Sequence, residues 1–224
     1  MYKQLDGVIF DLDGTLIDSM GVWAQVDVEF LQHHGHEAPP DLFDDLEGGN
    51  SFEEVADYMR RKFDLQLTNA EIMAEWTEMV AEHYRHSVPL KPGVREFLSR
   101  LRAAGIPMGV GTSNNAALAS AALAAHGVLD WFGCLVTGGG DLRGKPFPDV
   151  FLEAARRLNV DPRRCIVVED VLAGVQAGVA AGATVLAVKD ESAQREWCEI
   201  ANTARILAED FYEIAEWVEL RYKI

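Results

Sequence analysis

The sequence has few cysteines. Three occur among 224 residues, at positions 134, 165 and 198, and none has CxxC or Cys/His metal-ligand spacing. An odd and sparse count is typical of a reducing compartment and argues against a disulfide framework. Cys134 and Cys165 each begin a short apolar run, which favours buried structural thiols over reactive ones.

Basic residues are also scarce. The 20 Lys and Arg residues stand against 36 Asp and Glu residues, which gives a formal net charge of −16. Nucleic acids and anionic membranes both bind basic surfaces, so we expect neither as a partner. An anionic substrate would meet an unfavourable long-range field that local cations must overcome.

Long apolar runs are missing as well. No stretch reaches the roughly 18 apolar residues that a membrane-spanning helix needs. The first residues, MYKQLDG, hold no signal-peptide apolar region, so we expect a cytoplasmic protein. With 49% hydrophobic and 25% charged residues, the composition is that of a globular protein with a substantial core.

Short apolar runs alternate with amphipathic helical patterns along most of the chain. The runs are 8–10, 108–110, 134–136, 166–168 and 185–188, and the helical patterns include 94–105, 117–127 and 150–160. Gly105, Gly127 and Gly182 stand where helix C-caps are expected. This alternation predicts an α/β fold, a doubly wound and mostly parallel Rossmann-like sheet covered by helices on both faces.

Residues 18–88 break this alternation because they contain no strand-like run. Three stretches, MGVWAQVDVEFLQHHG, SFEEVADYMRRKF and AEIMAEWTEMVAEHY, have helical spacing, and Trp76, Val80 and Tyr84 share one helix face. We therefore predict a helical cap domain, residues 18–88, inserted after the first strand of a catalytic core formed by residues 1–17 and 89–224. Residues 17–19 and 88–93 would be its hinges.

Polar residues follow four of the predicted strands. They are Asp11, Asp13, Thr112, Ser113, Asn114, Lys145, Glu169 and Asp170. Ligands of open parallel sheets bind beyond the carboxyl ends of the strands, so these side chains should converge on one crevice.

Such a crevice would hold several carboxylates. Like charges at close range repel strongly unless one is protonated or a cation bridges them. An oxygen-rich cluster suits Mg²⁺, and Lys145 would attract phosphoryl oxygens as a point charge. A carboxylate nucleophile, a metal, a lysine and a hydroxyl together predict phosphoryl transfer through an aspartyl phosphate.

These residues resemble, in order, the four motifs of the haloacid dehalogenase-like hydrolase superfamily. The motifs are DLDGT (11–15), Thr112, Lys145-Pro146 and Glu169-Asp170, and the stretches GKPFPDVF and VVEDVLAGVQAGVAAGATVLAV add to the resemblance. It covers nearly the whole chain. The helical insertion resembles the type 1 cap of the subgroup that includes phosphoglycolate phosphatase-like enzymes and β-phosphoglucomutase.

The resemblance implies a role for each of the two aspartates of the first motif. Asp11 would be the nucleophile. Asp13 would protonate the leaving oxygen and then activate water, and its main-chain carbonyl would bind Mg²⁺. The superfamily's dehalogenases typically lack the second carboxylate, so Asp13 favours phosphate chemistry over carbon–halogen cleavage.

The resemblance also implies the remaining roles. Asp11, Asp13 and Asp170 would be metal ligands, with Glu169 at or near the metal. The phosphoryl oxygens would be held by Thr112 and Lys145, with Ser113 and Asn114 close by.

The cap distinguishes a phosphatase from a phosphomutase. β-Phosphoglucomutase-like enzymes carry a histidine where this sequence has Trp23 or a neighbour, and a cap arginine and lysine for a second phosphate. Here the corresponding loop reads Glu47-Gly48-Gly49-Asn50-Ser51 without arginine, and the third cap helix has no lysine. We therefore expect a phosphatase that acts on a small phosphomonoester, such as a sugar phosphate or a phosphoglycolate-like acid. A β-phosphoglucomutase-type enzyme is the alternative.

Structural interpretations of the same residues remain open. Asp11 and Asp13 could cap a helix and a turn, Glu169 and Asp170 could cap the next helix, and Trp23 could be a core residue. A non-catalytic phosphate-binding or regulatory protein on the same fold is the alternative from another class. The sequence does not indicate the natural substrate or the oligomeric state.

Overall fold

The computed structural model describes residues 4–46 and 49–224. Residues 1–3 of the segment MYKQLDG, and Glu47 and Gly48 of the cap loop, lie outside this description. Within the described residues, six strands form one sheet in the order β3-β2-β1-β4-β5-β6, and every neighbouring pair is parallel. The strands are β1 Gly7–Phe10, β2 Met108–Thr112, β3 Cys134–Thr137, β4 Cys165–Glu169, β5 Thr184–Val188 and β6 Ile206–Ala208. This confirms the Rossmann-like α/β fold.

The edge strand β6 was not expected from the sequence. It has three residues, two of them half-buried, so it gives neither a clear alternation nor a long apolar run. By contrast, all residues of the central strands β1 and β4 are buried, because helices cover both faces of the sheet. The apolar runs at these positions were therefore readable as strands.

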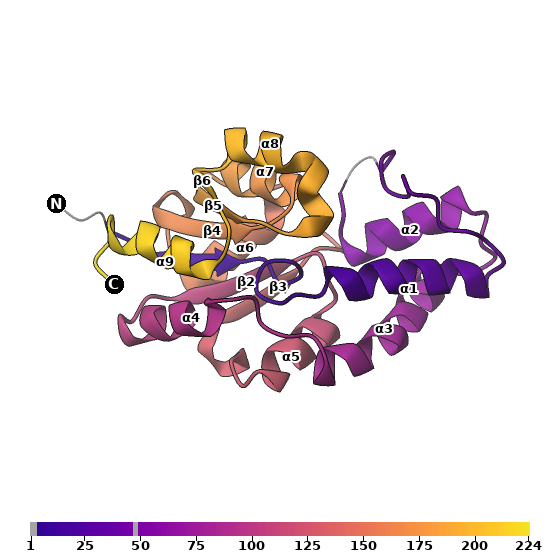
Figure 1. The fold of residues 1–224 in the computed structure, drawn as a ribbon, viewed down its shortest axis with the longest axis horizontal. Helices are drawn as coiled ribbons and strands as arrows, with labels where there is room; N and C mark the ends of the chain where they lie inside the picture. The colour runs from indigo at the N-terminus through magenta and orange to yellow at the C-terminus, as the bar shows by residue number, and fades with distance from the viewer. Residues whose placement is uncertain (1–3, 47–48) are drawn as a thin grey trace.

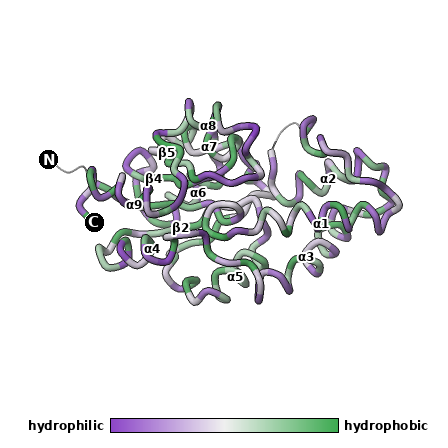
Figure 2. The backbone as a smooth tube through the Cα atoms, in the orientation of Figure 1, coloured by the Kyte–Doolittle hydropathy of each residue, from purple (hydrophilic) through white to green (hydrophobic). Residues whose placement is uncertain are grey.

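Two helical layers enclose the sheet (Figure 1). One face packs against α4 Val94–Ala103, α5 Ala116–Ala125 and α9 Phe211–Glu219, and the other against α6 Asp149–Leu158, α7 Leu172–Ala180 and α8 Trp197–Thr203. Short 3-10 turns lie at Leu129–Trp131, Pro162–Arg164 and Glu191–Glu196. In β1, Val8 and Phe10 belong to the core between the sheet and α4, α5 and α9. Ile9 belongs to the core between the sheet and α6, α7 and α8, as the alternation of side chains along a strand requires. Figure 2 colours the backbone by residue hydropathy and shows hydrophobic residues along the strands of the sheet.

The helices end as their sequences predict. Gly105, Gly127 and Gly182 follow α4, α5 and α7 with φ of 69°, 64° and 85°. This left-handed conformation stops a helix and suits glycine. The C-cap prediction is confirmed at all three positions.

The helices α1 Met20–His33, α2 Phe52–Lys62 and α3 Asn69–His86 form a lobe at the end of the molecule opposite the two termini (Figure 1). Ser51 and Thr68 begin α2 and α3 with capping boxes that Glu54 and Glu71 complete. All three helices of the insertion were predicted. None of the helices in the described part of the chain has both the length and the apolar character needed to cross a bilayer.

Two chain segments join this lobe to the sheet, and they lie side by side. Ile17 and Leu90 form an antiparallel bridge. The amide of Asp18 donates to the carbonyl of Pro89 at 2.9 Å, and the amide of Lys91 donates to the carbonyl of Leu16 at 3.0 Å. We call residues 16–18 and 89–91 the paired connector.

Candidate active site

The strand order places the end of β1 at the centre of one edge of the sheet. Phe10 pairs with Val110 of β2 on one side and with Val168 of β4 on the other. The strand order reverses between β1 and β4, and ligands of open α/β sheets bind at such switch points. Asp11 follows β1 and Asp170 follows β4, so both are attached to the strands that flank this point.

Lys145 joins two of the carboxylates in this place. Its ammonium group donates to the carboxylate of Asp11 and to Oε1 of Glu169, the latter at 2.5 Å. Lys145 is 2% exposed, so this ion triad is buried. One carboxylate oxygen each from Asp11, Glu169 and Asp170 lies within 4.8 Å of the others. The predicted convergence of Asp11, Lys145, Glu169 and Asp170 is therefore observed, and we call these four residues the acidic cluster.

Glu169 has partners for both of its carboxylate oxygens. Oε1 accepts from Lys145, and Oε2 accepts from the amides of Asp170 at 2.9 Å and Val171 at 3.3 Å. A Cβ on Gly174 would lie 1.9 Å from this carboxylate, so glycine makes room for it on α7. Glu169 thus forms an ion pair with Lys145 in the site and also accepts hydrogen bonds from main-chain amides that precede α7, as a helix-capping residue does.

Asp170 is satisfied at only one oxygen. Its Oδ1 accepts from the hydroxyl of Thr15 at 2.7 Å, while the buried Oδ2 has no hydrogen-bond partner among residues 4–46 and 49–224. A Cβ on Gly14, whose φ is +77°, would lie 2.2 Å from Oδ2. A buried carboxylate oxygen without a partner is costly, and carboxylate oxygens are the ligands that hard divalent cations prefer. The donor set of Asp11, Glu169 and Asp170 therefore fits a metal ion.

The charges of the acidic cluster lead to the same conclusion. Burial raises the pKa of Asp11 to about 8, against the opposing effect of Lys145. Burial also raises the pKa of Asp170 well above its usual range, and Glu169 and Asp11 add to this. Burial lowers the pKa of Lys145, but Asp11 and Glu169 raise it by more. One ammonium group does not balance three carboxylates, and a bound cation would favour their ionised forms.

Asp13 lies at the junction with the cap helices. Its Oδ1 accepts hydrogen bonds from the hydroxyl of Ser19 at 2.6 Å, from the indole of Trp23 at 3.2 Å and from the hydroxyl of Tyr84. Its Oδ2 accepts from the side-chain amide group of Asn114 at 2.8 Å. The carboxylate of Asp13 is thus oriented by groups from α1, α3 and the loop after β2.

The polar residues after β2 have different partners. Thr112 is buried, and its hydroxyl accepts from the main-chain N–H of Asn114 at 3.1 Å. Ser113 donates to the side-chain carbonyl of Asn50 at 2.7 Å, and Asn114 donates to Asp13. Ser113 therefore contacts Asn50 in the loop before α2, and Asn114 contacts Asp13. Thr112 is the last residue of β2.

The sequence did not reveal the roles of Tyr84, Ser19 and Thr15. Tyr84 was seen only as part of an apolar helix face, and it is indeed 1% exposed. Trp23 was singled out, and it both packs against Phe52 and donates to Asp13. The position of α1 directly after the first motif was the available signal for Ser19 and Trp23.

The start of α2 is docked on the loops that carry Lys145 and Ser113. The carboxylate of Glu54 accepts from the amide of Gly144 at 3.0 Å. The amide of Asn50 donates to the carbonyl of Lys145 at 3.0 Å, and that of Phe52 donates to the carbonyl of Ser113 at 2.8 Å. The lobe of α1, α2 and α3 and the acidic cluster are therefore connected through these loops.

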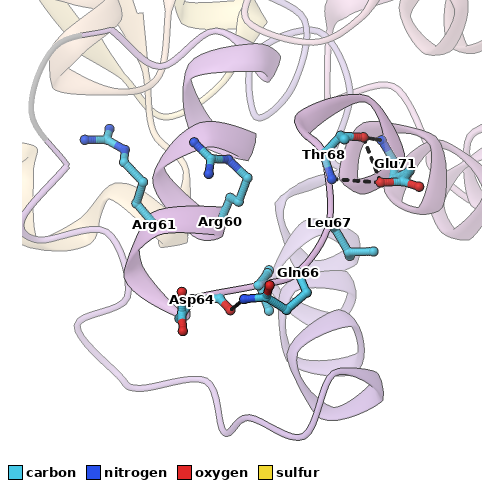
Figure 3. A pocket seen from close by; sticks show the side chains of 8 residues that line it. Arg60, Arg61, Asp64, Gln66, Leu67, Thr68 and Glu71 are labelled. Carbon is cyan, nitrogen blue, oxygen red and sulfur yellow. Dashed lines mark hydrogen bonds between the residues drawn. The ribbon is translucent and has the colours of Figure 1, made fainter.

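Two arginines of α2 lie elsewhere. Arg60 and Arg61 line a hollow between the end of α2 and the start of α3, and none of the strand-end residues lines it (Figure 3). Both pair with Asp57, at 2.7 Å and 2.9 Å. A second hollow of about 390 Å³, between α2 and residues 139–143, adjoins the docked loops. Its cations, Arg61 and Arg143, are paired with Asp57 and Asp149.

Comparisons with known proteins find relatives of similar sequence and fold. The family model described as haloacid dehalogenase-like hydrolase matches residues 5–182. Hexitol phosphatase A of Escherichia coli is 36% identical over 186 residues, which cover 81% of this chain and 82% of that protein. Fructose-1-phosphate phosphatase YqaB of the same organism is 32% identical over 192 residues, covering 84% and 99%. The crystal structure of CbbY from Rhodobacter sphaeroides with phosphate has a TM-score of 0.80 at 25% identity, covering 94% and 96%.

Proposed function

The chain belongs to the haloacid dehalogenase-like hydrolase family, and we propose that it is a Mg²⁺-dependent phosphatase acting through an aspartyl phosphate on Asp11. The observation that carries this proposal is the buried contact of Lys145 with Asp11 and Glu169, next to the unpartnered oxygen of Asp170. Asp11 thus has a cationic neighbour in Lys145, and the free oxygen of Asp170 beside it could bind a metal ion. Two relatives above 30% identity are named as phosphatases of hexitols and of fructose 1-phosphate.

In the first step, a carboxylate oxygen of Asp11 attacks phosphorus and the bond from phosphorus to the leaving oxygen breaks. Asp13 gives its proton to that oxygen, so the leaving group departs as a neutral alcohol. Lys145 and Thr112 hold phosphoryl oxygens, with Ser113 and Asn114 beside them.

In the second step, Asp13 takes a proton from water as the water attacks phosphorus. The bond to Asp11 breaks and inorganic phosphate forms. A Mg²⁺ ion held by Asp11, Asp170 and the main-chain carbonyl of Asp13, with Glu169 close by, would neutralise charge on the carboxylates and the phosphoryl group.

The surroundings favour a leaving group without charge. Arg60 and Arg61 share the single carboxylate of Asp57 and line a hollow that none of the strand-end residues lines, so we assign neither to a second phosphate or a carboxylate. Asp27 lies one helical turn after Trp23 on the same face of α1, and burial raises its pKa to about 7. In its ionised form this side chain would repel an anionic leaving group, and in either form its oxygens could accept hydrogen bonds from hydroxyl groups. We propose a sugar or polyol phosphate rather than a phosphoglycolate-like acid or a bisphosphate.

We also propose that residues 18–88 act as the cap domain over a core of residues 1–17 and 89–224. The cap would exclude water while the leaving group departs, and it would choose the substrate.

Phosphate release from a panel of esters tests these proposals. A hexitol phosphate, glycerol 3-phosphate, 2-phosphoglycolate and β-glucose 1-phosphate with a bisphosphate primer are each incubated with Mg²⁺ or with EDTA. We expect metal-dependent phosphate release, greatest for the polyol esters, and no glucose 6-phosphate. Asp11→Asn should abolish turnover, while Asp130→Asn, at an exposed site, should not. Turnover by Asp11→Asn at the wild-type rate would disprove the nucleophile, and phosphate binding without release would indicate a non-catalytic protein.

A further inference from the structure

The hydroxyl group of Tyr84 has an unambiguous set of partners. It accepts from the indole N–H of Trp23 at 2.7 Å and from the amide N–H of Asn114 at 3.1 Å. Both of those groups are donors only. The single proton of the Tyr84 hydroxyl is therefore free to go to one acceptor, and that acceptor is Oδ1 of Asp13.

We propose that Tyr84 is a positioning residue that fixes the carboxyl group of Asp13 for proton transfer and makes this orientation depend on the docked cap. The proposal rests on the proposed function, in which Asp13 protonates the leaving oxygen. Tyr84 stands near the end of α3 and lies 71 residues from Asp13, which follows β1, so this hydrogen bond joins the helical lobe to the sheet edge.

The burial of this network gives the hydrogen bond its importance. Tyr84 is 1% exposed and Asn114 is 5% exposed, so water does not replace a lost partner without rearrangement. The Tyr84 ring also packs edge-on against Trp23, with the ring centroids 6.3 Å apart. The hydroxyl and the ring can be separated experimentally, because Tyr84→Phe removes the hydroxyl and keeps the ring.

The dependence on the leaving group distinguishes positioning from simple stabilisation. An alkyl phosphate, such as glycerol 3-phosphate, needs a proton on its leaving oxygen, whereas p-nitrophenolate leaves without one. General acid catalysis typically contributes about 10²–10⁴-fold. We expect Tyr84→Phe to lower kcat about 10-fold to 100-fold for the alkyl ester and less than about 3-fold for p-nitrophenyl phosphate, with KM changed little for either.

Tyr58→Phe is the matched control. Tyr58 is another buried cap tyrosine, and its hydroxyl bonds to the carbonyl of Leu42 and to Asp45, away from Asp13. It should lower the melting temperature without changing the ratio of the two rates. Trp23→Phe removes a second donor to Asp13 and serves as the test if Tyr84→Phe does not fold.

Both wild-type rates are measured in the same assays, which separates the two proposals. Wild-type protein that hydrolyses neither ester would remove the proposed function and this inference with it. An active wild type with a selective loss in Tyr84→Phe, or in Trp23→Phe, supports the inference. Equal losses for both esters, or no loss for the alkyl ester, would overturn it while leaving the phosphatase proposal intact.

Discussion

Replacing Lys145 by methionine tests whether the acidic cluster depends on this single internal cation. The substitution keeps an unbranched apolar stem and removes the ammonium group that bonds to Asp11 and Glu169. Removing one partner of a buried ion pair costs about 3–5 kcal/mol, because the other partner is left uncompensated. For a chain of this size, about 1 kcal/mol shifts the melting temperature by roughly 2–4 °C. We therefore expect metal-free Lys145→Met to melt roughly 6–20 °C below the wild type.

The expected loss depends on pH and on Mg²⁺. The pKa of Asp11 is already raised by burial, and Lys145 is a cause that lowers it, so the variant raises it further. Below about pH 8 the Asp11 carboxyl group is protonated in both folded proteins, so the loss should grow as pH rises above about 8, where only the wild-type carboxyl group ionises. Saturating Mg²⁺ supplies positive charge and should recover part of the stability.

Thermal unfolding followed by circular dichroism, with EDTA and with Mg²⁺, measures this effect. Lys189→Met is the matched control, because Lys189 pairs with Glu209 at the surface, where the two side chains are 27% and 63% exposed. Such a pair contributes about 0–1 kcal/mol. Melting of metal-free Lys145→Met within about 2 °C of the wild type would refute the view that Lys145 holds buried anionic partners.

Three further outcomes are expected. Because burial raises the pKa values of both Asp11 and Asp170, Mg²⁺ must displace protons from them at lower pH, so its stabilising effect should grow between about pH 6 and 8 by about 1.4 kcal/mol per pH unit for each proton displaced; equal shifts in melting temperature across that range would contradict this. Burial raises the pKa of Asp27 to about 7, so the folded protein loses stability as pH rises from about 4 through 7. Asp27→Asn should therefore be more stable than the wild type by about 1–2 kcal/mol at about pH 8, and by less at about pH 5. Urea midpoints that differ from those of the wild type equally at both pH values would disprove this prediction. Gly14→Ala should lower the stability of the fold by about 1–3 kcal/mol and weaken the stabilising effect of Mg²⁺, because the new Cβ would lie 2.2 Å from Asp170 Oδ2. Gly35 has a similar φ of +79° in open space, so Gly35→Ala should leave the effect of Mg²⁺ unchanged. Equal responses of the two variants to Mg²⁺ would count against the metal site.

The sequence predicted the acidic cluster because strand-end position determines it. Asp11 and Asp170 directly follow fully buried strands, and parallel strands bring their carboxyl ends to one edge. The central strands β1 and β4 were readable because they are buried on both faces, whereas β3 and β6 are partly exposed and β6 has only three residues. Local pattern was sufficient wherever neighbouring strands fixed the geometry.

The contacts of Asp13 could not be predicted in the same way. Tyr84 and Trp76 occupy the same helix face, and both look like core residues in the sequence. Only the docking of α3 on the core determines that the Tyr84 hydroxyl reaches Asp13. Such contacts depend on how two folded units meet, which residue spacing along one helix does not encode. The same holds for Glu54, whose contact with Gly144 joins the cap to the core.

The paired connector has a consequence for how such proteins diversify. The chain leaves the sheet and returns to it through two strands of backbone joined by hydrogen bonds, so the entry and exit points stay adjacent whatever lies between them. An inserted segment can then be lengthened, shortened or exchanged as a cassette without moving β1 or α4. The reacting groups at the sheet edge would remain the same, while substitutions in the inserted segment could change the selectivity for the organic part of the ester.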